Sequence, residues 1–199
     1  MKTSRVFTLL ALILTLAACD ASDPEVKNRA TQSGFSEQGS EELAKEGVTP
    51  EEMESIAQAR QAGLDEASLI AMVRSLHKRD LKFDLGFALQ LMVQQGMGAT
   101  SLTQLVEIGA IPRWADDIRA LKEAGVSDVT IVEIAKLGFV EKKDLLSGYE
   151  YGQLKTNGLS DAGLLTFARQ GGTAQQLQKL VLELALGKPE PEALKNVGM

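Results

Sequence analysis

The chain has 199 residues, a formal net charge of −6, and hydrophobic and charged fractions of 44% and 24%, which are ordinary for one globular domain or a small domain with a tail. Its single cysteine and single histidine exclude an internal disulfide framework, a cysteine-cluster metal site and a multi-histidine metal centre. The acidic balance argues against a broad nucleic-acid surface. We therefore expect no metal, no other cofactor and no nucleic-acid partner.

The N-terminal segment up to Cys19 has the organisation of an export signal. Lys2 and Arg5 precede an apolar run over residues 6–18, which is shorter than the about 20 residues needed to cross a membrane but fits the apolar region of a secretory signal. The run ends in Leu16-Ala17-Ala18-Cys19, which closely resembles the lipobox of bacterial lipoproteins. The resemblance implies cleavage between Ala18 and Cys19. It also implies a diacylglycerol thioether on Cys19, with an N-acyl chain such as palmitate.

Two alternatives to a lipoprotein remain open, a plain secretory signal that leaves a free Cys19 thiol and a short uncleaved anchor. Cleavage after Ala18 removes two of the 21 basic residues and none of the 27 acidic ones, which leaves a charge of −8. Anionic headgroups repel such a chain, so we expect the lipid to provide the membrane attachment. Asp20 resembles the inner-membrane retention signal of Gram-negative lipoproteins, which implies the periplasmic face of the inner membrane. Alternatively, Asp20 only starts a polar tether.

Residues 19–46 are expected to form a flexible tether after the lipidated cysteine. Ser, Asp, Glu, Gln and Gly dominate this segment, and Val26, Phe35 and Leu43 are isolated apolar residues. Such a segment buries too little surface to offset the entropy lost on ordering. At most we expect a short helix over residues 40–46.

From residue 47 onward a short motif recurs. Gly47-Val48-Thr49-Pro50-Glu51 is followed by similar copies that begin at Gly63, Gly125 and Gly158. Glycine ends one helix in the left-handed conformation, the apolar residue packs on the next helix, and Thr, Ser or Asp caps it. The starts are separated by multiples of about 16 residues, the length of a short helix and a turn. Coincidence among 18 glycines is the alternative.

Between these motifs the apolar residues have helical spacing, as at Leu69, Val73 and Leu76. Capping-box patterns occur at Thr49 with Glu52, Ser101 with Gln104, and Thr173 with Gln176. Residues 129–132 could pass for a strand, but Ser127 caps them and favours a helix. Residues 83–93 are apolar nearly all round, which predicts a central, buried helix.

We therefore expect an all-α domain over residues 47–199, an array of nine or ten short helices that tertiary packing holds together. The choice between a curved solenoid and a compact bundle stays open. The recurring motif is similar to short helical repeats of bacterial envelope proteins, including the Gly-Val-Thr-Pro-Glu type appended to some membrane-bound peptidases. No His-Glu-x-x-His peptidase motif is present.

We expect no catalytic residues, so an enzymatic role is disfavoured. His77 lies in a charged helix end, where a histidine favours the negative end of the helix dipole, and no nucleophile is indicated beside it. Acid pairs occur at Glu41-Glu42, Glu51-Glu52 and Asp116-Asp117. Adjacent helical residues point about 100° apart, so these pairs do not face each other across a cleft as glycoside hydrolysis requires.

Trp114, Tyr149 and Tyr151 are the candidate binding surface, because tryptophan and tyrosine are enriched at recognition sites. Alternatively, Trp114 and one tyrosine are core residues. The leading hypothesis is a membrane-anchored, non-enzymatic helical-repeat module that binds an envelope protein or peptide. A carboxylate-dependent envelope hydrolase or lyase, and an inhibitor or immunity-type lipoprotein, are the alternatives.

Overall fold

The computed structural model describes residues 23–199, and all the regular secondary structure in that range is helical. Its helices are α2 (Pro24–Gln32), α3 (Glu37–Lys45), α4 (Pro50–Gln61), α5 (Glu66–His77), α6 (Gly86–Gln94), α7 (Ala99–Glu107), α8 (Ala115–Glu123), α9 (Asp128–Phe139), α10 (Gly148–Thr156), α11 (Asp161–Arg169), α12 (Ala174–Ala185) and α13 (Glu190–Asn196). The all-α class is confirmed, with ten helices over residues 47–199. The signal peptide, its cleavage between Ala18 and Cys19, lipidated Cys19 and Asp20 lie outside the described residues.

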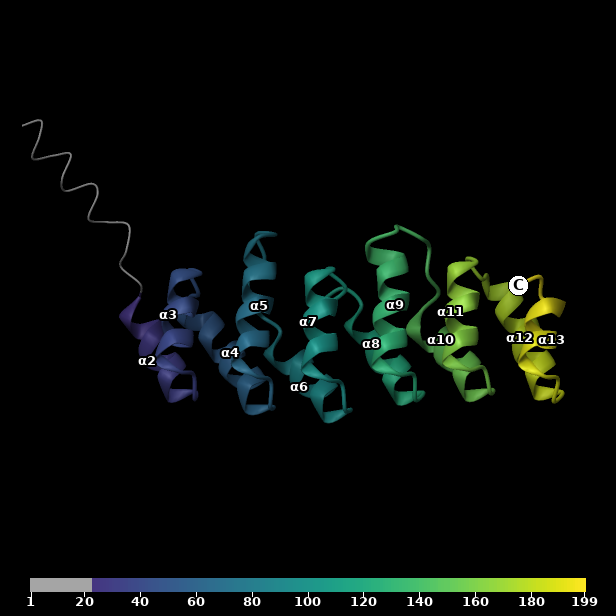
Figure 1. Ribbon diagram of the computed structural model, residues 1–199, viewed down its shortest axis with the longest axis horizontal. Helices are drawn as coiled ribbons and strands as arrows, with labels where there is room; N and C mark the ends of the chain where they lie inside the picture. The colour runs from purple at the N-terminus through teal and green to yellow at the C-terminus, as the bar shows by residue number, and fades with distance from the viewer. Residues whose placement is uncertain (1–22) are drawn as a thin grey trace, which may run out of the picture.

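The helices form two rows in an elongated array (Figure 1). The odd-numbered helices make one row and the even-numbered helices lie behind them, with α2 at one end and α12 and α13 at the other. Within the array, helices pack mainly on the second helix along the chain, as α4 does on α6 and α9 on α11. One continuous hydrophobic core runs from Val26 to Val197, so residues 23–199 contain a complete core of their own.

The array repeats with a period of about 62 residues, which is longer than the step of about 16 residues seen in the sequence. The sites with positive φ recur in four sets, Gly34, Gly96 and Gly158; Gly47, Gly109 and Gly171; Gly63, Gly125 and Gly187; and Asp80 and Lys142. Within the described residues only Gly198 falls outside these sets. The repeating unit therefore has four helices, α4 to α7 and then α8 to α11, and is flanked by the half-units α2–α3 and α12–α13. The shorter step expected from the sequence is one helix and one turn inside this unit.

A ladder of carboxylates links the starts of the odd-numbered helices. A first-turn acid of one helix accepts a hydrogen bond from the backbone N–H of the residue that caps the preceding odd helix. The pairs are Glu66 with Ser36 (2.8 Å), Asp128 with Gly98 (2.8 Å), Asp161 with Ser127 (3.0 Å) and Glu190 with Ser160 (2.7 Å). Each bond satisfies a donor that the helix start would otherwise leave unpaired. The ladder thus fixes the register from α3 to α5 and from α7 to α13, and it is interrupted between α5 and α7, where α7 begins with Ala99.

The flexible tether predicted for residues 19–46 is wrong for residues 24–45, which form α2 and α3. Val26, Phe35 and Leu43 are isolated in the sequence but are all buried, since α2 packs on α4 and α3 on α5. The Arg60 guanidinium also lies 5.6 Å from the centroid of the Phe35 ring. Local composition did not predict this burial, because it results from the packing of α2 and α3 on each other and on the helices of the next unit. The helical domain therefore begins before residue 47.

Two further local predictions need correction. The helix expected over residues 83–93 begins at Gly86, and its Phe87 side chain is 65% exposed. The Ser101 to Gln104 capping box does not form, because α7 already begins at Ala99. The boxes at Thr49 and Thr173 are confirmed, and Ser147 forms another with Glu150. Within residues 23–199 no helix has the length and apolarity to cross a membrane.

Candidate binding site

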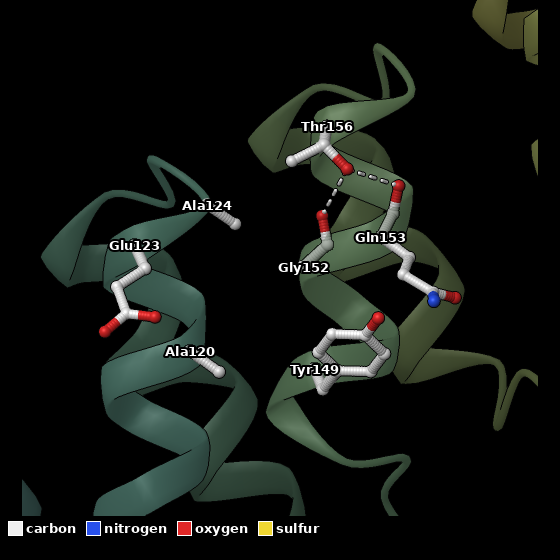
Figure 2. A pocket seen from close by; sticks show the side chains of 7 residues that line it. All are labelled: Ala120, Glu123, Ala124, Tyr149, Gly152, Gln153 and Thr156. Atoms are coloured by element: carbon white, nitrogen blue, oxygen red, sulfur yellow. Dashed lines mark hydrogen bonds between the residues drawn. The ribbon is translucent and has the colours of Figure 1, made fainter.

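A groove of about 300 Å³ lies between α8 and α10 (Figure 2). Its floor consists of the small residues Ala120, Ala124 and Gly152. Tyr149 stands at one end of the groove and Thr156 at the other, with Glu123 on the α8 side (Figure 2). Gln153 completes the lining from α10. The groove therefore has an apolar floor and a rim of polar and aromatic groups.

The repeat shows why the groove exists here. In the preceding unit Gln58 of α4 donates a hydrogen bond to the side chain of Gln90 on α6 over 2.9 Å, which closes the space between those helices. One unit later the same positions are Ala120 and Gly152. Two bridging amide side chains are thereby lost, and the space they would fill is open to a partner.

The two helices stay close at the start of α10 because of Gly148. Its backbone N–H donates to the Asp117 carboxylate over 2.6 Å, as that of Gly86 does to the Ser55 hydroxyl over 2.7 Å one unit earlier. A Cβ atom at Gly148 would overlap the backbone carbonyl of Asp117. The groove is thus an opening in an otherwise tight helix pair, held in shape by backbone contacts.

The exposed aromatic side chain at the rim is the one predicted candidate that the structure leaves on the surface. Tyr149 is 68% exposed, and its counterpart Phe87 at the start of α6 is 65% exposed. On the opposite wall, the Glu123 carboxylate accepts a hydrogen bond from the Gln95 amide over 3.1 Å. An apolar floor between an aromatic ring and a carboxylate suits a side chain with an apolar stem and a cationic or hydrogen-bond-donating end.

Tyr151 and Trp114, the other two predicted surface residues, belong to the core. Tyr151 is 1% exposed and meets Phe167 edge to face with centroids 6.4 Å apart, so the prediction of a surface role is wrong for it. Burial raises the pKa of Tyr151 to about 12. Trp114 is 8% exposed and its ring lies 6.2 Å from that of Phe139. Tyr151 lies within α10 and Trp114 is the residue that caps α8, and both are core residues, which was the alternative interpretation of the sequence.

The partly buried His77 and the buried Glu52 form a polar pair that the sequence did not reveal. His77 Nε2 lies 2.9 Å from the Glu52 carboxylate, and Nδ1 lies 2.8 Å from the carbonyl oxygen of Glu46. Both ring nitrogens therefore face acceptors, as an imidazolium requires. The Glu52 carboxylate also accepts the backbone N–H groups of Thr49 (2.9 Å) and Phe83 (2.8 Å). The pair thus connects the start of α4, the end of α5 and the loop before α6.

The pair favours the charged form of both groups. Burial by itself favours the neutral imidazole, but the hydrogen bonds to Glu52 and to the Glu46 carbonyl outweigh it and raise the pKa of His77. Burial likewise opposes the Glu52 carboxylate, but hydrogen bonds from the Phe83 and Thr49 backbones and from His77 lower its pKa. The prediction that His77 is a helix-end residue is confirmed by α5, which ends at His77, but its partner is a carboxylate.

The same position in the next unit is aromatic. One unit after Glu52 and His77 stand Trp114 and Phe139, which are in contact. Shallow hollows lie over both pairs, of about 330 Å³ over the polar pair and about 430 Å³ over the aromatic pair. Comparison of the sequence with itself at an offset of one unit would have aligned these pairs and exposed the Gln58/Gln90 substitution as well.

The acid pairs noted in the sequence have structural partners. Glu42 pairs with Arg74 (2.9 Å), Glu52 with His77, and Asp117 with the Gly148 backbone. In the part of the chain that the structure describes, no three His, Cys, Asp or Glu side chains gather to hold a metal ion. No protein-family model matches the chain, and no curated protein matches it in sequence. Its function is therefore inferred from its own residues.

Proposed function

We propose that the chain is a lipid-anchored bacterial envelope protein whose helical array binds another envelope protein or a peptide in the groove between α8 and α10. The observation that carries the proposal is the loss of the Gln58–Gln90 bridge at Ala120 and Gly152, in the unit that also exposes Tyr149. Solenoid proteins bind partners through such extended surfaces. The groove chemistry favours a segment that carries a basic side chain, which also complements the acidic chain.

Attachment to the membrane rests on Leu16-Ala17-Ala18-Cys19 and its similarity to a lipobox. Asp20 supports the periplasmic face of the inner membrane in a Gram-negative cell. A lipid at Cys19 would precede the first described helix by only a few residues, so the array is expected to lie close to the membrane that holds the lipid.

The anchor is tested with Cys19→Ser, expressed in a bacterium that processes lipoproteins. We expect the unchanged chain to incorporate labelled palmitate and to enter the detergent phase, and the variant to do neither. A variant that still partitions with membranes would show that the lipobox interpretation is wrong.

The groove is tested by photocrosslinking in cells that produce the protein naturally. A photoreactive amino acid at position 149 is expected to give one dominant adduct with another envelope polypeptide. The matched control is position 129, because Val129 is 71% exposed but belongs to the odd-numbered row. Equal adducts from both positions, or none from position 149, would count against the groove.

A further inference from the structure

The last even-numbered helix, α12, leaves two leucines on the surface. Leu182 and Leu186 are 59% and 67% exposed and are one helical turn apart, so they form one apolar patch. The exposed residues of α12 around them include Gln175, Gln178, Ala185 and the charged Lys179. Glu183, beside Leu182 in the chain, is partly buried and pairs with Lys188 over 2.7 Å. Large exposed hydrophobic side chains grouped in this way mark an interaction surface.

The repeat identifies this patch as a helix-packing face. Leu182 and Leu186 stand one unit after Ala120 and Ala124, which line the contact of α8 with α10. One unit before those alanines the positions are Gln58 and Ala62 at α4, where Gln58 bonds to α6. In both earlier units another even-row helix covers these positions. In the described residues no even-row helix lies against this face of α12, which leaves Leu182 and Leu186 exposed.

We propose that α12 of a second copy covers this face, so that two chains form a closed dimer through a two-fold axis beside Leu182 and Leu186. A two-fold contact brings identical surfaces together and therefore needs a surface that does not repel itself. The chain that follows the proposed cleavage site has a net charge of −8, but Lys179 is the one charged residue among the fully exposed residues of α12. Two acidic molecules can meet there without an exposed carboxylate of α12 on either side.

The surface of α2, the first even-row helix in the described residues, differs from that of α12. Exposed residues of α2 are mainly polar or charged, among them Glu25, Asn28, Arg29 and Gln32. Terminal repeats of solenoid proteins have a polar outer face of this kind, which keeps them in water. The two ends are thus not complementary, so a head-to-tail filament is disfavoured and α12 pairs with α12.

Sedimentation of the chain that begins at residue 20 tests the dimer, because the complete core lies within residues 23–199. At about 100 µM we expect the dimer to be populated, because a dimer with a small interface has a dissociation constant in this range. Leu182→Glu/Leu186→Glu is expected to raise the dissociation constant at least about 100-fold, because four leucines leave the interface and four carboxylates replace them. The control Phe87→Glu/Val129→Glu makes the same chemical change elsewhere and should leave the dimer intact.

Cysteine crosslinking identifies the paired surface directly. Since Cys19 is the only cysteine in the sequence, a chain from residue 20 with Leu186→Cys carries a single thiol. We expect mild oxidation to convert it to a covalent dimer at least about ten times faster than the Val129→Cys chain, because the two-fold axis raises the local concentration of the second thiol. Circular dichroism shows whether each variant still folds. The uncharged variant Leu182→Gln/Leu186→Gln removes the apolar contact without adding charge, so a folded but monomeric chain shows loss of contact and not loss of fold. A monomer at about 100 µM, or equal oxidation of both cysteine variants, would overturn the proposal.

Discussion

Replacing Glu52 and His77 by the residues that stand one unit later tests whether the four-helix units are equivalent. The double variant Glu52→Trp/His77→Phe transfers the aromatic pair of Trp114 and Phe139 into the first unit. If the repeat is a true structural equivalence, the two aromatic side chains will pack there as they do in the second unit. Each single variant will instead place an aromatic side chain beside the remaining polar residue, His77 in one variant and Glu52 in the other.

The cost of each single variant follows from the hydrogen bonds that it removes. Glu52→Trp removes the acceptor of His77 and of the Phe83 backbone N–H, which costs about 3 kcal/mol, the lower end of the range for buried ion pairs, because His77 is partly exposed. His77→Phe leaves the carboxylate its two backbone donors but removes its counter-charge, which costs about 2–3 kcal/mol. The double variant leaves neither charge unpaired and buries two aromatic rings. We expect its free energy of unfolding to lie within about 2 kcal/mol of the unchanged chain.

The measurement is a double-mutant cycle by urea unfolding at pH 6, monitored by circular dichroism. The predicted coupling between the two positions is at least about 2 kcal/mol in favour of the double variant. Strictly additive effects would show that the aromatic pair does not form at this position and that the equivalence fails.

The cycle also has a defined pH dependence. The pKa of His77 is raised from its ordinary 6.5, so its contribution is complete below that pH and is lost as the pH rises through the folded-state pKa. The pKa of Glu52 is lowered from 4.5, so its contribution is present above that pH and is lost as the pH falls through the folded-state pKa. The difference in stability between the unchanged chain and the double variant should therefore peak between about pH 4.5 and 6.5.

Two other predictions concern the contacts between helices of one row. Gly148→Ala should lower the free energy of unfolding by about 1–3 kcal/mol, because its Cβ meets the Asp117 backbone. Gly152→Ala, whose Cβ would lie 3.2 Å from that of Ala124, should instead be neutral or stabilise the chain by up to about 1 kcal/mol. A lower thermal unfolding midpoint for both variants would contradict this difference. Asp161→Asn should cost about 1–3 kcal/mol at pH 7, since Asp161 accepts hydrogen bonds from Lys155, Ser127 and Thr130. Burial opposes the charge of Asp161, but these bonds lower its pKa to about 2, so acid titration should show the difference vanishing as the pH falls from about 4 to about 2. Asp116→Asn, at a carboxylate that is 96% exposed, is the control and should change little.

The helices could be predicted from the sequence because their signals are local. The glycine motifs at Gly47, Gly63, Gly125 and Gly158 do end helices with positive φ, and Ser127 does cap α9. The burial of Val26 and Phe35 could not be predicted in this way, since it results from packing between helices, of α2 on α3 and α4 and of Arg60 on the Phe35 ring. Burial in a solenoid is decided by the adjacent unit, so local composition underestimates it.

The candidate site was predictable only in part for the same reason. Tyr149 was recognised by residue type, but residue type did not separate it from the buried Tyr151 two positions later. The groove depends on what Ala120 and Gly152 lack, and an absent side chain has meaning only against the Gln58–Gln90 bridge of the neighbouring unit. The period of the four-helix unit is the sequence signal that aligns Ala120 and Gly152 with Gln58 and Gln90.

Closing the groove tests the proposed binding role most directly. Ala120→Gln/Gly152→Gln introduces the two amide side chains that bridge α4 and α6, and circular dichroism confirms that the array still folds. With a photoreactive residue at position 149 in both backgrounds, we predict that the open groove gives the partner adduct and that the closed groove reduces it at least about tenfold, a loss of about 1.4 kcal/mol in binding free energy. Undiminished adduct from the folded, closed-groove chain would contradict the account.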